Sequence, residues 1–211
     1  MIDVNGVSLT IGTSRILRDV RLTAGPGEIV GLIGRNGSGK TMLLRCIAGL
    51  VRPTAGTVTA DGIVVGRDRD FLPSSGIIIE TPGFISYYSG MRNLMLLAGI
   101  RGKAGREEVR EAVRLAGLDP DDRRPVRKYS LGMRQRLGIA QAVMEDPRYL
   151  LLDEPMNGLD GEGLADMREL FISLKNKGKT LLIASHSRED IEILCDRVYE
   201  MDKGRISGEK A

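Results

Sequence analysis

The chain has 211 residues, which is enough for one domain with a substantial core. It carries 31 basic and 28 acidic side chains, and a net charge of +3 gives no electrostatic case for a nucleic-acid partner. No stretch approaches the roughly 20 uninterrupted apolar residues of a membrane-spanning helix, and the first residues lack a signal-peptide pattern. We therefore expect a cytoplasmic protein.

Strand patterns dominate the first eighty residues. Short strands are predicted at residues 2–5, 20–23, 29–33, 57–62 and 77–79. The first two alternate apolar and polar side chains, as half-buried strands do, whereas the run at 29–33 is apolar throughout. Gly-Pro-Gly at 25–27 predicts a turn that leads into this first fully buried strand.

An eight-residue loop separates the strand at 29–33 from an apolar helical stretch that ends near Leu50. Its residues, in the pattern G-x-x-x-x-G-K-[ST], are Gly34, Arg35, Asn36, Gly37, Ser38, Gly39, Lys40 and Thr41. Glycines let backbone N–H groups approach phosphate oxygens, and the N-terminus of the following helix adds partial positive charge. Lys40 can reach the β- and γ-phosphates, and Thr41 can offer its hydroxyl to Mg²⁺. The loop predicts a nucleoside triphosphate site, with a plain glycine turn as the alternative.

The pattern becomes helical from about residue 93 to residue 143. Apolar residues between Val109 and Ala116 recur at helical intervals, and Gly117 can end that helix. Two short apolar runs then follow, at 150–152 and 180–184, and both have the composition of buried parallel strands.

These elements predict an α/β fold in a single domain over residues 1–211. Its core has a mainly parallel sheet and an N-terminal antiparallel β portion. A helical subdomain inserted at about 81–140 divides this core into the segments of about 1–80 and 141–211.

Two adjacent carboxylates end the strand at 150–152. Asp153 and Glu154 are thereby expected at the C-terminal edge of the parallel sheet, where ligands of such sheets bind. Asp153 can hold Mg²⁺ directly or through water, and Glu154 can polarise an attacking water. An acidic turn closed by Pro155 is the alternative interpretation.

Further motifs follow in an order that resembles the ATP-binding cassette (ABC) family, and the resemblance covers nearly the whole chain. The segment that looks like the family's signature contains Ser130, Leu131, Gly132 and Met133. The segment 157–160 looks like the D-loop and ends in Asp160. His186 follows an apolar strand and looks like the switch histidine that contacts the γ-phosphate. The resemblance implies an ABC-type P-loop ATPase core that uses ATP and Mg²⁺.

The resemblance also implies how such a chain works. Two nucleotide-binding domains face each other head to tail, and ATP on the phosphate loop of one contacts Ser130 and the backbone of Gly132 of the other. ATP binding closes the dimer and hydrolysis reopens it. The chain would then need a second ABC subunit, identical or different, and a multi-span membrane permease that holds it on the inner face of the cell membrane. A soluble ABC ATPase of the iron–sulfur-assembly type is the alternative.

Three departures from the common family pattern carry information. The signature segment at 129–133 reads Tyr-Ser-Leu-Gly-Met in place of the commoner Leu-Ser-Gly-Gly-Gln. Glu80 stands where most members have glutamine, and the segment 80–84 resembles exporters of the bacitracin-resistance and lantibiotic-immunity type. The carboxylate keeps an oxygen ligand for Mg²⁺ or the lytic water but loses the amide donors. Ile11 stands where an aromatic residue usually stacks on adenine, and isoleucine offers apolar contact without a π-face.

Aromatic and methionine side chains gather just after this segment. They are Phe84, Ile85, Tyr87, Tyr88 and Met91. Such a group either packs inside the helical portion or forms a cleft that receives a helix of the membrane partner, and the sequence leaves both interpretations open.

Overall fold

The computed structural model describes residues 1–80 and 83–210. Its strands are β1 (Ile2–Ile11), β2 (Ser14–Ala24), β3 (Ile29–Ile33), β4 (Ala55–Ala60), β5 (Ile63–Val64), β6 (Ser75–Ile78), β7 (Tyr149–Asp153), β8 (Thr180–Ser185), β9 (Arg197–Asp202) and β10 (Arg205–Lys210). Its helices are α1 (Lys40–Ala48), α2 (Gly90–Arg101), α3 (Arg106–Leu115), the 3-10 turn Val126–Lys128, α4 (Leu131–Val143), α5 (Gly161–Asn176) and α6 (Arg188–Leu194).

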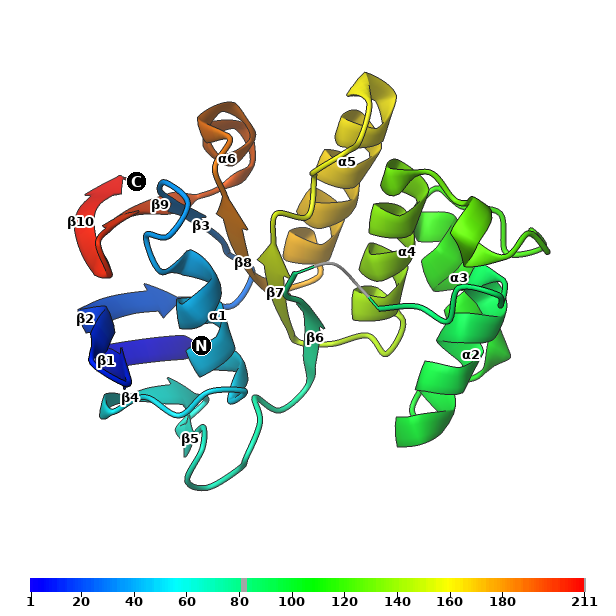
Figure 1. The fold of residues 1–211 in the computed structure, drawn as a ribbon. Helices are drawn as coiled ribbons and strands as arrows, with labels where there is room; N and C mark the ends of the chain where they lie inside the picture. Colours follow the sequence, from blue (N-terminus) through cyan, green and yellow to red (C-terminus); the bar gives the residue numbers. More distant parts are fainter. Residues whose placement is uncertain (81–82, 211) are drawn as a thin grey trace.

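The strands form two sheets, and both had been expected from the sequence. One is antiparallel with the order β2-β1-β4-β5. The other has the order β10-β9-β3-β8-β7-β6 and is parallel from β9 to β6, with only β10 antiparallel. Figure 1 shows α1 between these sheets, while α4 and α5 lie beyond the other face of the parallel sheet.

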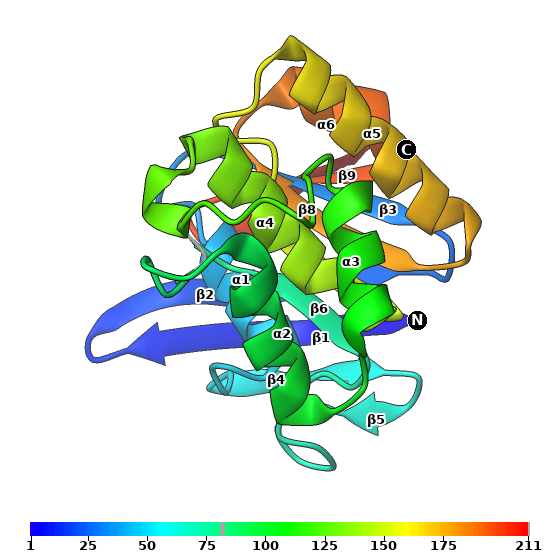
Figure 2. The ribbon, with the colours of Figure 1, turned by 90° about the vertical axis from the view of Figure 1, so that its right-hand side faces the viewer.

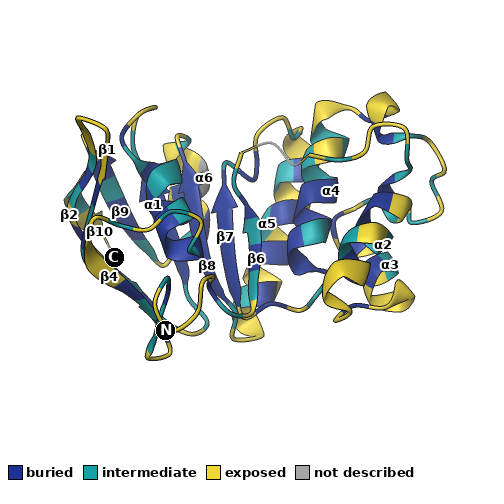
Figure 3. Ribbon diagram, turned by 60° about the horizontal axis from the view of Figure 1, so that its bottom comes forward, coloured by how far each residue is buried: buried dark blue, intermediate teal, exposed yellow. Residues whose placement is uncertain are grey.

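The central parallel strands are buried on both faces, and this explains their uninterrupted apolar sequences. Side chains alternate along a strand, so Leu151 packs in the core that contains α1, whereas Leu150 and Leu152 pack in the core beneath α4 and α5. The same alternation divides β3, where Ile29 faces one core and Val30 the other. Figure 3 shows β7 and β8 as buried throughout.

A helical side of the molecule is formed by α2, α3 and α4, which pack against one another (Figure 2). Ser89 caps α2 by accepting a hydrogen bond from the backbone N–H of Arg92 at 3.3 Å. The buried Asn93 bonds to both backbone groups of Ile85, at 2.7 and 3.1 Å, and so holds the preceding loop against α2. We retain the division into a core and a helical subdomain of about 81–140 as a proposal.

The last fifty residues contain most of what the sequence analysis missed. Helices α5 and α6 and the hairpin of β9 and β10 have no counterpart among the predicted elements. In β10 only two of the six residues are even partly buried, so its polar sequence gives little strand signal. Among the described residues, no helix combines the length and apolar character needed to cross a membrane.

Candidate nucleotide site

Parallel pairing brings the ends of four strands to one edge of the sheet. Ile33 pairs with Ser185, Asp153 with Ala184, and Ile78 with Leu152. The phosphate loop follows β3, the two adjacent carboxylates end β7, and the predicted switch histidine follows β8. The sheet register therefore gathers motifs that are far apart in sequence.

The phosphate loop is shaped for close backbone approach. A Cβ on Gly34 would lie 2.4 Å from the carbonyl oxygen of Met201 and 2.7 Å from Oγ of Ser38, so only glycine fits there. Gly39 has a φ of 108° immediately before α1 begins. The hydroxyl of Ser38 is buried and has no hydrogen-bond partner among the described residues. A buried hydroxyl without a partner fits a loop that closes on a phosphate oxygen.

Lys40 is buried, with only 6% of its surface exposed. Its Nζ donates a hydrogen bond to the carbonyl oxygen of Gly34 at 2.7 Å, and a longer one to that of Arg35 at 3.5 Å. An anionic phosphate oxygen is a stronger acceptor than either neutral carbonyl, so the ammonium is placed to exchange these partners for phosphate.

Thr41 and Asp153 meet across the edge of the sheet. The Thr41 hydroxyl donates to Oδ2 of Asp153 at 2.6 Å. Burial raises the pKa of Asp153, and the hydrogen bond from Thr41 opposes that rise. Among the described residues no three His, Cys, Asp or Glu side chains form a metal cluster. A hydroxyl beside a carboxylate suits Mg²⁺, which takes few protein ligands and binds substrate phosphates as well.

Glu154 lies beside His186, as the sequence motifs predict for a common catalytic edge. Nδ1 of His186 is 2.9 Å from Oε2 of Glu154, and the Ser185 hydroxyl donates to the same oxygen at 3.3 Å. Glu154 has a φ of 49°, in the left-handed region that a residue with a Cβ seldom adopts. Strained backbone of this kind is concentrated at functional sites. Ser185 was not among the predicted site residues, although a hydroxyl directly after an apolar strand was a signal for it.

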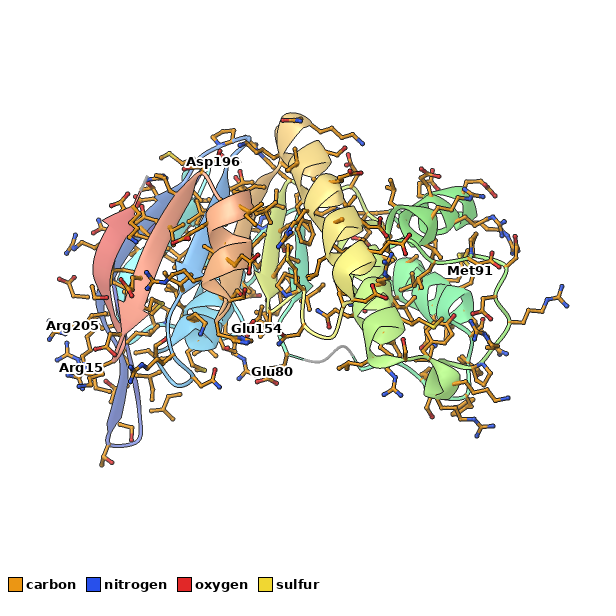
Figure 4. The ribbon with its side chains drawn as sticks, turned by 90° about the horizontal axis from the view of Figure 1, so that it is seen from above. Arg15, Glu80, Met91, Glu154, Asp196 and Arg205 are labelled. Carbon is orange, nitrogen blue, oxygen red and sulfur yellow. The ribbon has the colours of Figure 1, made fainter. Side chains whose placement is uncertain are left out.

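Glu80 lies on the same edge but turns to a different partner (Figure 4). Its carboxylate accepts from Arg45 at 2.6 Å, and its side chain is 64% exposed. A cavity of about 350 Å³ beside the phosphate loop is lined by Lys40, Thr41, Asp153 and Glu154, among others, but not by Glu80. Its predicted approach to Mg²⁺ stays a prediction.

The signature segment lies against the D-loop of the same chain. Ser130 caps α4 by accepting from the backbone N–H of Met133 at 3.1 Å, and Asp160 caps α5 in the same way at 2.8 Å. A Cβ on Gly132 would lie 2.9 Å from the carbonyl oxygen of Gly158. None of the four signature residues lines the cavity beside the phosphate loop, and Leu131 is 62% exposed.

Comparison with known proteins decides the family. The ABC transporter family matches residues 17–157. The chain belongs to this family. An uncharacterised ABC transporter ATP-binding protein, YybJ of Bacillus subtilis (strain 168), is 41% identical over 98% of this chain and 94% of its own length.

Two other ABC proteins agree with this assignment. The bacitracin transport ATP-binding protein BcrA of Enterococcus faecalis is 38% identical over 98% of this chain and 68% of its own length. A solved ATP-binding subunit of an ABC transporter has a TM-score of 0.89 at 26% identity and covers 100% of this chain and 90% of its own. The chain is therefore an ATP-binding ATPase subunit of the ABC transporter family, as the motifs implied.

The cavity beside the phosphate loop has an apolar wall residue on β2. Ile16, on β2, lines the cavity beside the phosphate loop, while Ile11 is 53% exposed and does not line it. The sequence analysis missed Ile16. The predicted contact between Ile11 and adenine remains a prediction, and neither isoleucine provides an aromatic face.

We expect ATP and GTP to bind within about tenfold of each other, because most of the affinity should come from the phosphates. Aromatic stacking on a base contributes about 1–3 kcal/mol where it has been measured in nucleic-acid binding. Competition titration with both nucleotides measures the ratio, and Ile11→Tyr and Ile16→Tyr, made separately, identify which position faces the base. A preference for ATP above a hundredfold in the unaltered chain would show that another residue reads adenine.

Proposed function

We propose that this ABC ATPase energises a separate membrane permease, in an exporter of the antibiotic or peptide type. The observation that carries the proposal is the convergence of the phosphate loop, the Thr41–Asp153 pair and the Glu154–His186 pair on one sheet edge. The exporter type is supported by the likeness to a bacitracin transport protein and by the segment 80–84, of which residues 81–82 lie outside the described part. The similar proteins bear transport names, which does not favour the iron–sulfur-assembly alternative.

In the proposed reaction, residues of this chain hold the triphosphate and prepare a water for attack on the γ-phosphate. The backbone of the phosphate loop and Lys40 would hold the phosphates, while Thr41 and Asp153 would hold Mg²⁺, with Glu80 as a further proposed ligand. Bound Mg²⁺ supplies positive charge that stabilises the charge developing on the phosphate oxygens.

Glu154 takes the proton of the lytic water as general base. His186 and Ser185 both contact its Oε2, so two neighbours orient the carboxylate. His186 is 58% exposed and can turn to contact the γ-phosphate.

The proposed dimer places a second ABC subunit, identical or different, over the nucleotide. The 13-residue α4 is capped by Ser130 and begins with Leu131, Gly132 and Met133, and a helix N-terminus attracts phosphate. Because this segment does not line the cavity of its own chain, it is available to the phosphate loop of a facing subunit. Asp160, which caps α5 beside it, belongs to the same proposed interface. ATP binding then closes the pair and hydrolysis reopens it.

An apolar groove supports docking of the permease. The groove has a volume of about 470 Å³ and lies between the edge strand β6 and helices α2 and α4. Phe71 and Ile100 line it and are 59% and 78% exposed, which is unusual for large apolar side chains.

The aromatic and methionine side chains after residue 83 differ in their burial. Phe84 and Met91 pack against the core, whereas Tyr87 is 66% exposed.

Ile100→Glu tests the docking. We expect the tagged variant to lose a multi-span membrane protein that co-purifies from native membranes with the unaltered chain, because a carboxylate in the groove opposes apolar contact. Mass spectrometry identifies the partner, and ATP affinity should be unchanged. Ile172→Glu is the matched control, since Ile172 lies on α5 and is 42% exposed. If no membrane protein accompanies the unaltered chain, the transport proposal fails.

A further inference from the structure

An ion pair joins Arg45 of α1 to Glu80, the residue that stands where most ABC proteins have glutamine. The Arg45 guanidinium lies 2.6 Å from Oε1 of Glu80, with 32% and 64% of the two side chains exposed. No other described residue forms a hydrogen bond or ion pair with the Glu80 side chain. Among the described residues, Arg45 is the side chain that holds this carboxylate in place.

Helix α1 places this pair one turn from the metal ligands. Thr41 and Arg45 are four residues apart on α1, so their side chains share one face, with Cβ atoms roughly 5–6 Å apart. Thr41 holds Asp153 on that face, and Arg45 holds Glu80 one turn further along. The two carboxylates are near enough to interact: burial is the main cause of the raised pKa of Asp153, and the charge of Glu80 adds to it.

The backbone at Glu80 is strained in this arrangement. Its φ is 65°, in the left-handed region that costs free energy for any residue with a Cβ. Such a conformation persists when its surroundings hold it, and the ion pair with Arg45 is part of those surroundings. Opening the pair would leave the carboxylate free to change direction.

We propose that Arg45, one helical turn beyond Thr41, is a positioning residue that holds Glu80 away from the metal site, so that Glu80 reaches Mg²⁺ or the lytic water only when this ion pair opens. The inference rests on the proposed role of Glu80 and adds a regulator to it.

A double-mutant cycle tests this inference, with Mn²⁺ as the metal probe. The four proteins are the unaltered chain, Arg45→Gln, Glu80→Gln and the double variant. Free Mn²⁺ is measured by electron paramagnetic resonance in the presence of a non-hydrolysable ATP analogue, so the readout does not depend on turnover. We expect Arg45→Gln to tighten Mn²⁺ binding by about two- to fivefold, the range of a lost exposed ion pair. The same change in the Glu80→Gln background should have no such effect.

Comparing the four proteins separates the proposed role of Glu80 as a metal ligand from the proposed role of Arg45 in restraining it. If Arg45→Gln tightens binding equally in both backgrounds, the effect is one of net charge and the positioning role is wrong. If Arg45→Gln changes nothing while Glu80→Gln weakens Mn²⁺ binding, Glu80 is a metal ligand but Arg45 does not restrain it. If Glu80→Gln changes nothing in either background, the proposed role of Glu80 itself fails.

A control variant and a salt series test whether the effect of Arg45→Gln is specific to its ion pair with Glu80. Arg52→Gln is the matched control, because Arg52 faces Asp70 at 3.6 Å in a more exposed pair and its loss removes the same charge. It should leave Mn²⁺ affinity within about twofold of the unaltered chain. Raising the ionic strength should narrow the difference between the unaltered chain and Arg45→Gln, since salt screens exposed pairs. A difference that does not change with salt would contradict a simple ion pair.

Discussion

Glu154→Gln should slow ATP turnover by about 10²–10⁴-fold, the usual contribution of a positioned general base. The amide keeps the shape of the side chain but cannot take the proton of the lytic water. The phosphate contacts of Lys40 and the loop backbone are unaltered, so ATP should still bind and hold the proposed dimer closed. Phosphate release measures turnover, and size-exclusion chromatography with ATP and Mg²⁺ measures the dimer.

The control for this prediction is Glu192→Gln, on the exposed side of α6, which should turn over normally. In Glu154→Gln the amide oxygen can still accept from His186 and Ser185, so we expect no loss of stability. Thermal unfolding of the variant would detect a loss of these hydrogen bonds. Turnover at the normal rate would exclude Glu154 as the base. Lost turnover without a stable dimer would leave the base in place and contradict the proposed closure.

Lys40→Ala should instead weaken ATP binding itself, by roughly 10- to 150-fold, because a charge-assisted hydrogen bond contributes about 1.5–3 kcal/mol. Equilibrium titration with a fluorescent ATP analogue measures the change. The side chain is buried and bonded to Gly34, so its removal could also disturb the loop. Lys40→Met separates these causes, since it keeps the apolar stem and removes only the charge.

Lys40→Ala and Lys40→Met should lose affinity for ATP to a similar extent if the charge of the Lys40 ammonium is what binds the phosphates. Affinity that survives in Lys40→Met but not in Lys40→Ala would assign the loss to collapse of the loop. The exposed Lys103 provides a control, and Lys103→Ala should bind ATP normally. In this way the two lysines distinguish a local phosphate contact from a general effect of net charge.

Local motifs were predictable from sequence, and contacts between elements were predictable only where strand pairing determines them. The phosphate loop is contiguous, so its pattern alone identifies it. The approach of Thr41 to Asp153 follows from parallel strands that end together, although 112 positions separate the two residues. Arg45, Ile16 and Ser185 were missed, because the direction in which they point depends on how helices and strands pack rather than on any local pattern.

The same limit applies to whole elements. Strands β7 and β8 are buried on both faces and read as apolar runs, whereas β10 is mostly exposed and gives no periodic signal. The partner of Glu80 could not be inferred either. Arginine four residues after Thr41 is an ordinary helix residue until the fold brings the end of β6 beside it.

The alternation of β7 between two cores has a consequence for insertions and deletions. Loss of one residue inside β7 would send Leu151 into the core of Leu150 and Leu152, and would at the same time retract Asp153 and Glu154 from the sheet edge. A length change there therefore damages folding and chemistry together. We therefore expect related sequences to differ in the lengths of their loops, but to have the same number of residues between the positions of Tyr149 and Glu154.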